Sequence, residues 1–496
     1  MSYKALEHFV HATACVKRLE EKFSNCKRRW SWVRSPVGPL DFLFGKERVH
    51  MKIVADLQIH SRFARACSKD LTLPNLEKYA KVKGITLLGT GDFQHPIWNK
   101  EIKENLKEDE NGILWSKTGF PFLWQTEVSL MYSQGGKGRR IHNLIFSPNQ
   151  AVADQIIEAL GKRGRLDYDG RPIFGFSCIE LVEMMQSISD KIEIIPAHSW
   201  TPWFGLFGSK TGFDSIKECF QEKAKHIHAI ETGLSSDPAM NWRLSQLDNI
   251  QLVSFSDNHS YWPWRLGREV TVFEAKDLSY NNILHSIRTG EGLAETIEVD
   301  PSYGKYHVDG HRLCGVCLNP EESKKIGEVC PKCKKKLTVG VLSRIEQLAD
   351  RPEGYKPKNR PTFKSVIPLS ETIAFSIGSG NPASKPVWQA YYKLIERFGS
   401  EFNVLADAQK DELAKVVDPQ IAENIIRIRQ GGVKILPGFD GIYGVPVFKK
   451  EDEEKLNLVR MKSVQKEIKD IENEVKTKKE KPKKLGQKGL LDFAKN

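Results

Sequence analysis

No stretch of the sequence is long and apolar enough to cross a membrane. A spanning helix needs roughly 18 or more apolar residues in a row, and no run of this chain reaches that length. The amino-terminal stretch MSYKALEHFVHATACVKRLEEKF carries acidic residues and lacks the unbroken apolar segment of a secretory signal. We therefore expect a cytoplasmic protein that has no membrane partner.

A nucleotide-binding phosphate loop is also missing. The stretch SIGSGNPASK at 376–385 resembles a phosphate cradle, but it ends in Ser-Lys rather than in Gly-Lys-Ser or Gly-Lys-Thr. We expect no nucleotide hydrolysis.

Cysteine is sparse and unevenly distributed. The chain has 9 cysteines, an odd number, and four of them form two Cys-x-x-Cys pairs separated by twelve residues. In a reducing compartment such pairs favour metal binding over disulfides. The spacing suits one tetrahedral Zn²⁺ with no open position, so we predict a structural zinc site held by Cys314, Cys317, Cys330 and Cys333.

The length and charge of the chain indicate several folded units and a polyanionic partner. A chain of 496 residues is too long for one ordinary core. Its net charge of +12 favours nucleic acid as the partner, which implies association with the nucleoid. We expect a monomer. The predicted units are an amino-terminal extension (1–50), a barrel (51–300), a zinc-binding module (301–345), a helical basic DNA-binding domain (346–450) and a flexible tail (451–496).

Residues 1–50 show no sustained periodicity, whereas a clean strand begins at Met51. Two interpretations stay open. The native chain starts at Met51 and the first fifty residues come from a start codon placed too far upstream, or a short helical extension covers residues 3–24.

From Met51 onwards, short apolar runs alternate with amphipathic segments. Parallel strands joined by crossover helices are the usual result of such a series, so we predict an α/β barrel. The predicted strands lie within 52–60, 84–92, 124–133, 139–147, 191–200, 226–234 and 250–259. The predicted helices lie within 73–83, 147–164, 179–189 and 213–225.

Every one of these strands carries an ionisable residue of metal-ligand type in or just after it. The residues are Asp56, His60, Asp92, His95, Glu127, His142, His198, Glu231, Asp257 and His259. Singly, each is more often a core residue than a ligand. Because the carboxyl ends of barrel strands open onto one face, the side chains would converge there, and so many carboxylates and imidazoles need cations. The pattern predicts a multinuclear metal centre.

The order of these residues resembles the polymerase and histidinol phosphatase (PHP) family. That resemblance implies a distorted (β/α)7 barrel holding two or three divalent ions (Zn, Mn or Mg) for phosphoester hydrolysis. The implied ligands are His60, His95, Glu127, His142, His198, Asp257 and His259, of which Glu127, Asp257 and His259 are the predicted catalytic residues. The sequence departs at two positions, because Gln58 stands where the first histidine is usual and Ala66 where some members have another. We expect one metal position to be weakened, or to be bound through His60, His198 and Asp257 with Gln58 as a hydrogen-bond partner behind them.

Two loops after the last strands are rich in aromatic residues. Bases stack on aromatic side chains, and arginines hold backbone phosphates. We predict nucleic-acid contacts for Trp200, Trp203, Phe204, Trp262 and Arg265. The alternative is that the aromatic residues simply cover the barrel mouth.

The carboxyl-terminal stretch QKGLLDFAKN follows a lysine-rich segment. Gln487, Leu490 and Phe493 have the Gln-x-x-aliphatic-x-x-aromatic spacing of a sliding-clamp peptide, which places Leu490 and Phe493 on one helical face. We predict a sliding clamp, either a PCNA ring or a bacterial β clamp, as a partner.

The whole chain resembles the endonuclease Q family of DNA repair nucleases. The resemblance rests on the barrel signature, the zinc spacing, the basic helical region and the clamp-type tail. The resemblance implies cleavage of damaged DNA on the 5′ side of deaminated bases (hypoxanthine, uracil, xanthine) and abasic sites. The residues alone indicate metal-dependent phosphodiester hydrolysis on nucleic acid. Two alternatives stay open: a small-molecule phosphatase of the histidinol-phosphatase type, and a non-catalytic adaptor bound to the replication clamp.

Overall fold

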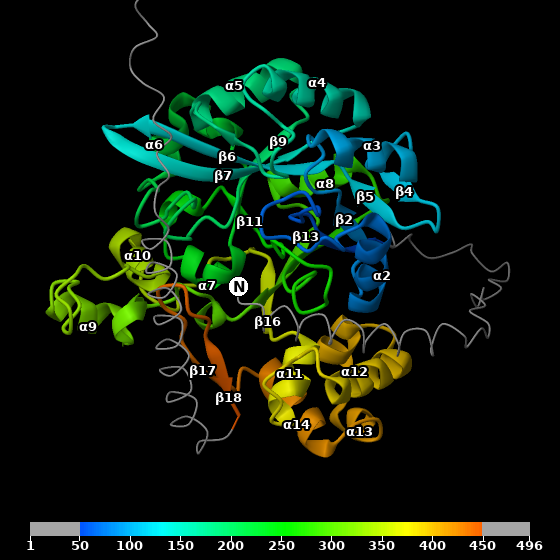
Figure 1. Cartoon of the computed structure of the whole chain (residues 1–496), viewed down its shortest axis with the longest axis vertical. Coiled ribbons are helices and arrows are strands. Elements are labelled where there is room, and N and C mark those ends of the chain that lie inside the picture. Colours follow the sequence, from blue (N-terminus) through cyan, green and yellow to red (C-terminus); the bar gives the residue numbers. More distant parts are fainter. Residues whose placement is uncertain (1–49, 449–496) are drawn as a thin grey trace, which may run out of the picture.

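An eight-stranded sheet forms the centre of the computed structural model, which describes residues 50–448 (Figure 1). Its strand order is β16-β13-β12-β1-β2-β5-β4-β3. Its strands are β1 (Met51–Asp56), β2 (Leu87–Gly89), β3 (Leu106–Glu108), β4 (Leu114–Ser116), β5 (Pro121–Leu123), β12 (Val270–Ala275), β13 (Leu293–Val299) and β16 (Thr362–Val366). The predicted strand at 52–60 is β1, which pairs parallel with β2 and antiparallel with β12.

A separate four-stranded sheet has the order β8-β6-β7-β9. Its strands are β6 (Gln125–Gln134), β7 (Lys137–Phe146), β8 (Ile173–Phe174) and β9 (Glu193–Pro196), and a parallel pair, β10 (Ala229–Glu231) and β11 (Gln251–Val253), follows. Strands β6 and β7 form a long antiparallel hairpin, because only Gly135 and Gly136 connect them. The predicted α/β class is confirmed. The predicted closed barrel is not, since the sheets of residues 50–448 do not join into one ring.

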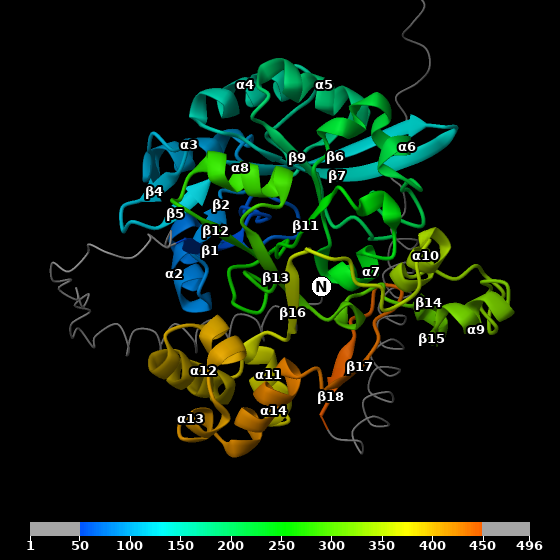
Figure 2. The ribbon, with the colours of Figure 1, turned by 180° about the vertical axis from the view of Figure 1, so that it is seen from behind.

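Helices cover the outer faces of these sheets, and α4 and α5 lie along the four-stranded sheet in both views (Figures 1 and 2). Helix α2 has the bounds that the sequence predicts, because Pro74 opens it and Gly84 ends it with a left-handed φ of 96°. The helices of this part are α2 (Leu73–Lys83), α3 (Pro96–Asn105), α4 (Gln150–Gly161), α5 (Cys178–Ile188), α6 (Ile216–Phe220), α7 (Pro238–Asn241) and α8 (Tyr280–Thr289).

Two smaller units complete the described chain. The cysteine-containing unit has β14 (Asp309–His311), β15 (Val316–Leu318), α9 (Pro320–Lys325) and α10 (Val341–Leu348). The helical unit has α11 (Leu369–Ser376), α12 (Lys385–Phe398), α13 (Lys410–Ala414) and α14 (Pro419–Arg429), followed by the hairpin of β17 (Lys434–Leu436) and β18 (Val445–Val447). Strand β16 falls in the range predicted to be a separate helical domain, yet it pairs with β13 of the central sheet.

Short 3-10 and π turns connect several of these elements. They are η1 (Gln221–His226), η2 (Gly233–Ser235), η3 (Ser245–Leu247), η4 (Pro301–Tyr303), η5 (Arg312–Cys314) and η6 (Asn403–Asp407). None of the helices within 50–448 has the length and apolar character to cross a membrane. The predicted amino-terminal extension and the predicted clamp peptide lie outside the described residues.

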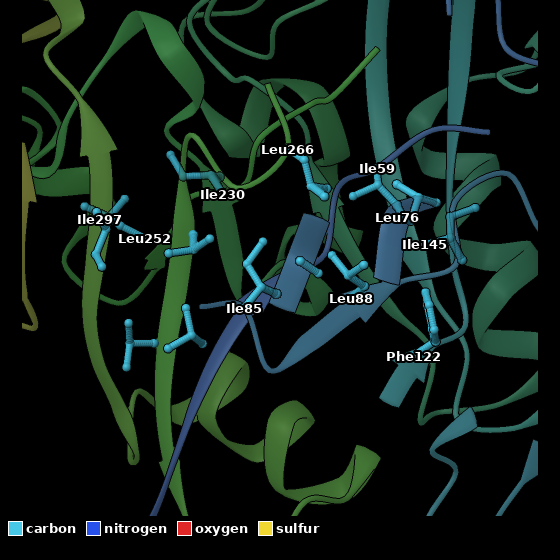
Figure 3. Packing of buried hydrophobic residues seen from close by; sticks show 14 of the residues in the cluster. Ile59, Leu76, Ile85, Leu88, Phe122, Ile145, Ile230, Leu252, Leu266 and Ile297 are labelled. Carbon is cyan, nitrogen blue, oxygen red and sulfur yellow. The ribbon is translucent and has the colours of Figure 1, made fainter. Parts of the chain in front are cut away.

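One large apolar core joins the sheets to the helical unit. It runs from strand residues such as Ile145, Ile230 and Ile297 (Figure 3) to Trp388 and Ile425 of the helical unit. Burying such side chains contributes about 1.5–3 kcal/mol each. The helical unit is therefore packed onto the α/β body as part of the same core.

A buried ion pair strengthens the same junction. Lys83, at the end of α2, donates from Nζ to Glu401 Oε1 at 2.7 Å and to the carbonyl oxygen of Pro263 at 2.7 Å. Glu401 also accepts from the Leu369 N–H at 2.9 Å and from the Tyr391 hydroxyl at 2.7 Å. Both charged side chains are almost fully buried, at 1% and 0% exposure.

Removing one member of this pair should destabilise the whole chain. Glu401→Gln leaves the Lys83 ammonium buried without a counter-ion, so we expect a loss of about 3 kcal/mol in the free energy of unfolding. Urea denaturation measures this loss. The exposed pair Lys410–Glu423 provides the control, since Glu423→Gln should change the midpoint very little. Equal stability of Glu401→Gln and wild type would show that the junction does not depend on the pair.

Candidate active site

The candidate site is organised around the buried carboxylate of Glu127, on β6. Its Oε2 lies 3.1 Å from His60 Nε2 and accepts a hydrogen bond from Gln58 Nε2 at 3.2 Å. Its Oε1 lies 2.7 Å from His142 Nδ1 and 3.4 Å from His198 Nε2. The carboxylate therefore faces two sets of side chains, one with each oxygen.

Two groups of possible metal ligands lie on these two sides. Their members are His60, Asp257 and His259 in one group and Glu127, His142 and His198 in the other, and within each group the ligand atoms lie within 4.8 Å of one another. Six of the seven predicted barrel ligands are thus brought together, as three residues in each group. Imidazole nitrogens with carboxylate oxygens suit zinc and manganese, and Glu127 is placed to connect the two positions.

The backbone at the strand ends is held in an unusual conformation. Asp92, His198 and Asp257 have left-handed φ angles of 42°, 30° and 45°. Residues other than glycine rarely have left-handed φ angles. Those that do cluster at functional sites, where the surrounding structure must stabilise the conformation. For His198, the side chain of Glu231 does so by accepting a hydrogen bond from the His198 N–H.

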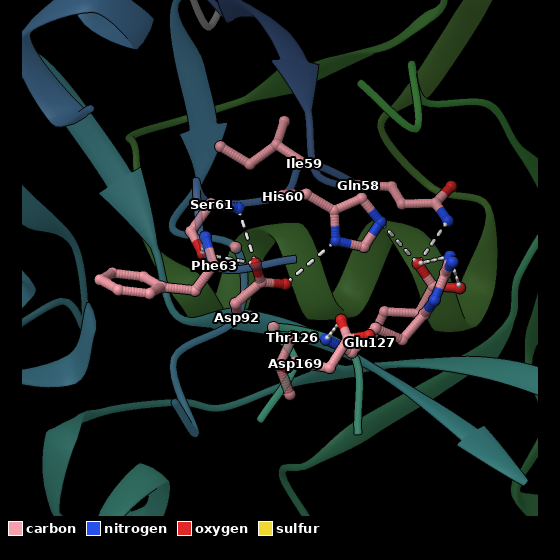
Figure 4. Close-up of polar contacts among 12 residues, drawn as sticks. Gln58, Ile59, His60, Ser61, Phe63, Asp92, Thr126, Glu127 and Asp169 are labelled. Atoms are coloured by element: carbon pink, nitrogen blue, oxygen red, sulfur yellow. Dashed lines mark hydrogen bonds and ion pairs between the residues drawn. The ribbon is translucent and has the colours of Figure 1, made fainter. Parts of the chain in front are cut away.

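Asp92 orients His60 from behind (Figure 4). Its Oδ1 lies 3.0 Å from His60 Nδ1, and its Oδ2 accepts from the N–H and the hydroxyl of Ser61 at 2.6 and 2.7 Å. A carboxylate on one ring nitrogen fixes the tautomer and leaves the other nitrogen free to bind a metal ion. The sequence pattern included Asp92 among the strand-end residues but not among the predicted ligands.

The electrostatics of the site favour bound cations. Burial opposes ionisation of Glu127 and Asp257, but Arg171 and His142 around the first, and His259 and His60 around the second, hold both pKa values below their usual range. Burial would lower the pKa of His60, yet Asp92 and Asp257 raise it well above the usual value. The carboxylates of Asp92, Glu127 and Asp257 lie close together around His60, and such a cluster needs nearby positive charge. The donor set therefore fits divalent ions.

Arg171 is a residue that the sequence analysis missed. Its Nη1 lies 3.3 Å from Oε1 and 3.4 Å from Oε2 of Glu127. It lies two residues before the short strand β8, which pairs with β6 two residues beyond Glu127. The signal in the sequence is only the tripeptide Gly-Arg-Pro in a loop, and nothing local connects it to the strand-end residues.

Two other predicted ligand positions behave differently from the six. The His95 ring stacks on Phe63 with 4.3 Å between centroids and belongs to neither group. Gln58 turns its amide nitrogen, not its oxygen, towards Glu127, and its buried Oε1 has no hydrogen-bond partner among the described residues. This orientation agrees with a hydrogen-bonding role for Gln58 behind the ligands.

The predicted nucleic-acid contacts are divided by burial. Trp200 is 1% exposed and donates to Asn241, and Trp262 is 6% exposed and stacks on Trp264, so both belong to the core and cannot present a face to a base in this structure. Trp203, Phe204 and Arg265 are partly exposed. Phe204 lies beside the site, with its ring 4.4 Å from that of His142. For Trp200 and Trp262 the covering role is the correct interpretation.

A second candidate metal site lies in the unit around β14 and β15. Its ligand atoms, within 4.8 Å of one another, belong to His311, Cys314, Cys330 and Cys333. The predicted cysteine cluster is thus present, and His311 is a further candidate ligand beside it that the spacing did not indicate. Val316 of β15 points into the small core with Cys330, and the next side chain, that of Cys317, is exposed on the other face of the strand.

The chemistry of this second site also fits a metal ion. Burial alone would raise the pKa of the Cys330 thiol, but the backbone N–H groups of Cys333 and Lys332 lower it to about 6. The thiolate is the form that binds metal. Three cysteines and one histidine are a common ligand set of structural zinc sites.

The fold and the site together define an α/β protein with a candidate multinuclear metal centre at strand ends and a separate, cysteine-rich candidate metal site. The comparison with solved structures makes the assignment specific. The chain belongs to the endonuclease Q family.

Two solved structures support this assignment over most of the chain. The lesion-specific endonuclease PfuEndoQ from Pyrococcus furiosus is 32% identical, with a TM-score of 0.72, over 82% of this chain and 99% of that chain. A complex of endonuclease Q with a 27-mer duplex carrying an abasic lesion at its active site is 33% identical, with a TM-score of 0.73, over 81% and 98% of the two chains.

Two uncharacterized proteins are similar to this chain in sequence. The uncharacterized protein YqxK of Bacillus subtilis is 30% identical over 79% of this chain and 98% of its own length. The uncharacterized protein MJ0043 of Methanocaldococcus jannaschii is 36% identical over 51% of this chain, which spans about a third (32%) of that relative. The family described as the MJ0043 C-terminal domain matches residues 368–432, which include the four helices α11 to α14.

The two ligand sets for the cysteine-rich site can be separated by substitution. We expect Cys330→Ser and His311→Ala to lose the bound zinc and to destabilise this unit, because metal binding supplies folding energy in small units. Cys317→Ser is the matched control and should keep the zinc. Metal analysis of the purified variants gives the answer. If Cys317→Ser loses zinc and His311→Ala keeps it, the four cysteines are the ligand set.

Proposed function

We propose that this chain is a metal-dependent DNA repair endonuclease. It hydrolyses the phosphodiester on the 5′ side of deaminated bases (hypoxanthine, uracil, xanthine) and of abasic sites. The observation that supports this most is the pair of ligand groups that meet at Glu127, whose Oε2 lies 3.1 Å from His60 of the other group. The chain is also similar to lesion-specific endonuclease Q over 82% of its own length and 99% of that chain. More specifically, we propose that the site has the metal-dependent phosphoesterase arrangement of the PHP type.

The side chains of the site have two proposed roles: some bind cations, and others orient the cation-binding side chains. His60, Asp257 and His259 would hold one divalent ion, and Glu127, His142 and His198 would hold a second. Divalent ions at such positions stabilise the charge that develops in phosphoryl transfer and lower the pKa of an attacking water. His95 stays a proposed ligand of a third, weaker position. Asp92 and Gln58 fix the orientation of His60 and Glu127.

The substrate approaches from the side on which the site is open. The side chains of Asp257, His259 and Arg171 are 28%, 34% and 24% exposed, whereas those of His60 and Glu127 are fully buried. A phosphodiester can therefore reach Asp257 and His259 first. The partly exposed Trp203, Phe204 and Arg265 are proposed to contact the DNA around this opening.

The other units have supporting roles in the proposal. A structural zinc ion stabilises residues 301–345, and residues 346–450 form a basic helical DNA-binding domain beside the α/β body of residues 51–300. The protein acts as a monomer on damaged DNA in the nucleoid. The support for these roles comes from the candidate ligand set at His311 and from the net charge of +12.

Two alternative functions differ from the proposed endonuclease in what the protein would bind or hydrolyse. A small-molecule phosphatase would hydrolyse p-nitrophenyl phosphate faster than damaged DNA. A non-catalytic adaptor would contain the structural zinc and no metal at Glu127. Gln58 favours the adaptor to a small degree, since an amide at this position is a poorer ligand than an imidazole.

Removing the charge of Asp257 should abolish cleavage. Asp257→Asn keeps the size of the side chain but weakens a ligand of the first metal position, so we expect no nicking of duplexes that carry uracil, hypoxanthine or an abasic site. A gel assay with Mg²⁺, Mn²⁺ and Zn²⁺ compared measures it, and DNA affinity and the melting curve should stay close to wild type.

The exposed Asp154, on α4, supplies the control. Its carboxylate pairs only with Lys103 at the surface among the described residues, so Asp154→Asn should cleave at the rate of wild type. Cleavage by Asp257→Asn at the wild-type rate would remove the metal mechanism.

We also propose that the carboxyl-terminal peptide binds a sliding clamp. Gln487, Leu490 and Phe493 lie outside the described residues, so this proposal rests on their spacing. Phe493 is the largest apolar group of the peptide, and Phe493→Ala should cost roughly 2 kcal/mol or more of clamp affinity. Pull-down with the cognate clamp measures the loss. Nicking without clamp should not change, and equal capture of the variant and wild type would refute the clamp motif.

A further inference from the structure

The loop that carries Arg171 is tied to the candidate site at several points. Asp169 Oδ1 accepts from the backbone N–H groups of Arg65 and Arg171, both at 3.1 Å. The Gly170 N–H donates to the carbonyl oxygen of Phe63 at 3.1 Å, and its own carbonyl accepts from Gln94 Nε2 at 2.6 Å. The carbonyl oxygen of Pro172 accepts from the Ser129 N–H at 3.0 Å, so the backbone of this loop is fixed on both sides of Arg171.

Glycine at position 170 is required by how closely the loop approaches the site. A Cβ there would lie 2.2 Å from Asp92 Oδ2, the oxygen that accepts from Ser61. Because Asp92 orients His60, a larger residue would disturb both the loop and the imidazole. The loop is thus fitted against the carboxylate that supports the first ligand group.

Arg171 faces the buried carboxylate and the solvent at the same time. Its two hydrogen bonds to Glu127 both use Nη1, which leaves Nη2 and Nε without a partner among the described residues. The side chain is 24% exposed, and the other partly open members of the site are Asp257 and His259. A planar guanidinium presents its remaining N–H groups as a fork that matches two phosphate oxygens.

We propose that Arg171 is a further catalytic residue of the reaction set out above, and this inference rests on that proposed function. Nη1 stays on Glu127 while the outer edge of the guanidinium donates to a non-bridging oxygen of the phosphodiester to be cleaved. The contact adds a fixed positive charge where the phosphoryl group becomes more negative. It also compensates for Gln58, whose amide holds Glu127 but supplies neither charge nor a strong ligand.

The test separates a phosphate contact from simple support of Glu127. In Arg171→Met, a positive charge leaves the site, so divalent metal should bind as tightly as in wild type or more tightly, measured by calorimetry. The affinity of the metal-loaded protein for inorganic phosphate should fall about tenfold, and single-turnover cleavage should fall on the order of 100-fold, as for removal of one donor to a transition-state oxyanion. Arg171→Lys should fall between wild type and Arg171→Met.

Arg163→Met is the matched control, because Arg163 also pairs with a carboxylate, Glu180 on α5, but at the surface. It should keep metal affinity, phosphate affinity and rate. Loss of metal together with cleavage in Arg171→Met would overturn the inference in favour of a supporting role, and unchanged phosphate affinity would overturn it outright. The phosphate measurement needs no DNA, so wild-type protein that binds phosphate through Arg171 but cleaves no duplex would refute the proposed function alone.

Discussion

Glu127 is the residue on which the two sheets converge. It lies on β6 of the four-stranded sheet, while Gln58 and His60 reach it from the end of β1 in the eight-stranded sheet. A fully buried carboxylate is costly unless several donors surround it. The hairpin partner β7 supplies His142, and the loop before β8 supplies Arg171. The relative position of the sheets and the geometry of the site are thus determined by the same contacts.

The sequence predicted the features that depend on local periodicity. Helix α2 has the predicted bounds because proline and glycine define its two ends. Of the ten residues that the strand pattern identified, the structure gathers six into two groups, from His60 to His259. His60, His198 and Asp257 follow the carboxyl ends of their strands, where side chains share one edge. Glu127 lies instead near the start of β6, and His142 lies in the middle of β7.

Features that depend on distant segments were not predictable in the same way. Strands β6 and β7 form an antiparallel hairpin, where the predicted parallel barrel would have a crossover connection. The two sheets also stay separate, although the sequences of the individual strands do not indicate this. Trp262 looked available for base stacking, but Trp388 of α12 packs against it with 5.6 Å between ring centroids. His311 joins the cysteine cluster because β14 pairs with β15 in a register that the Cys-x-x-Cys spacing does not encode.

The helical unit bears directly on the position of the site. The loop that carries Asp257 and His259 continues into Trp262 and Pro263, and Pro263 is bound by Lys83, whose counter-ion Glu401 belongs to the helical unit. Rigid packing transmits such constraints, because a close-packed core has little free volume to absorb a displacement. The helical unit and the open edge of the site therefore form one body. A phosphodiester at this edge would meet Asp257 and His259 at a fixed distance and orientation, which is the condition for cutting at a defined phosphate.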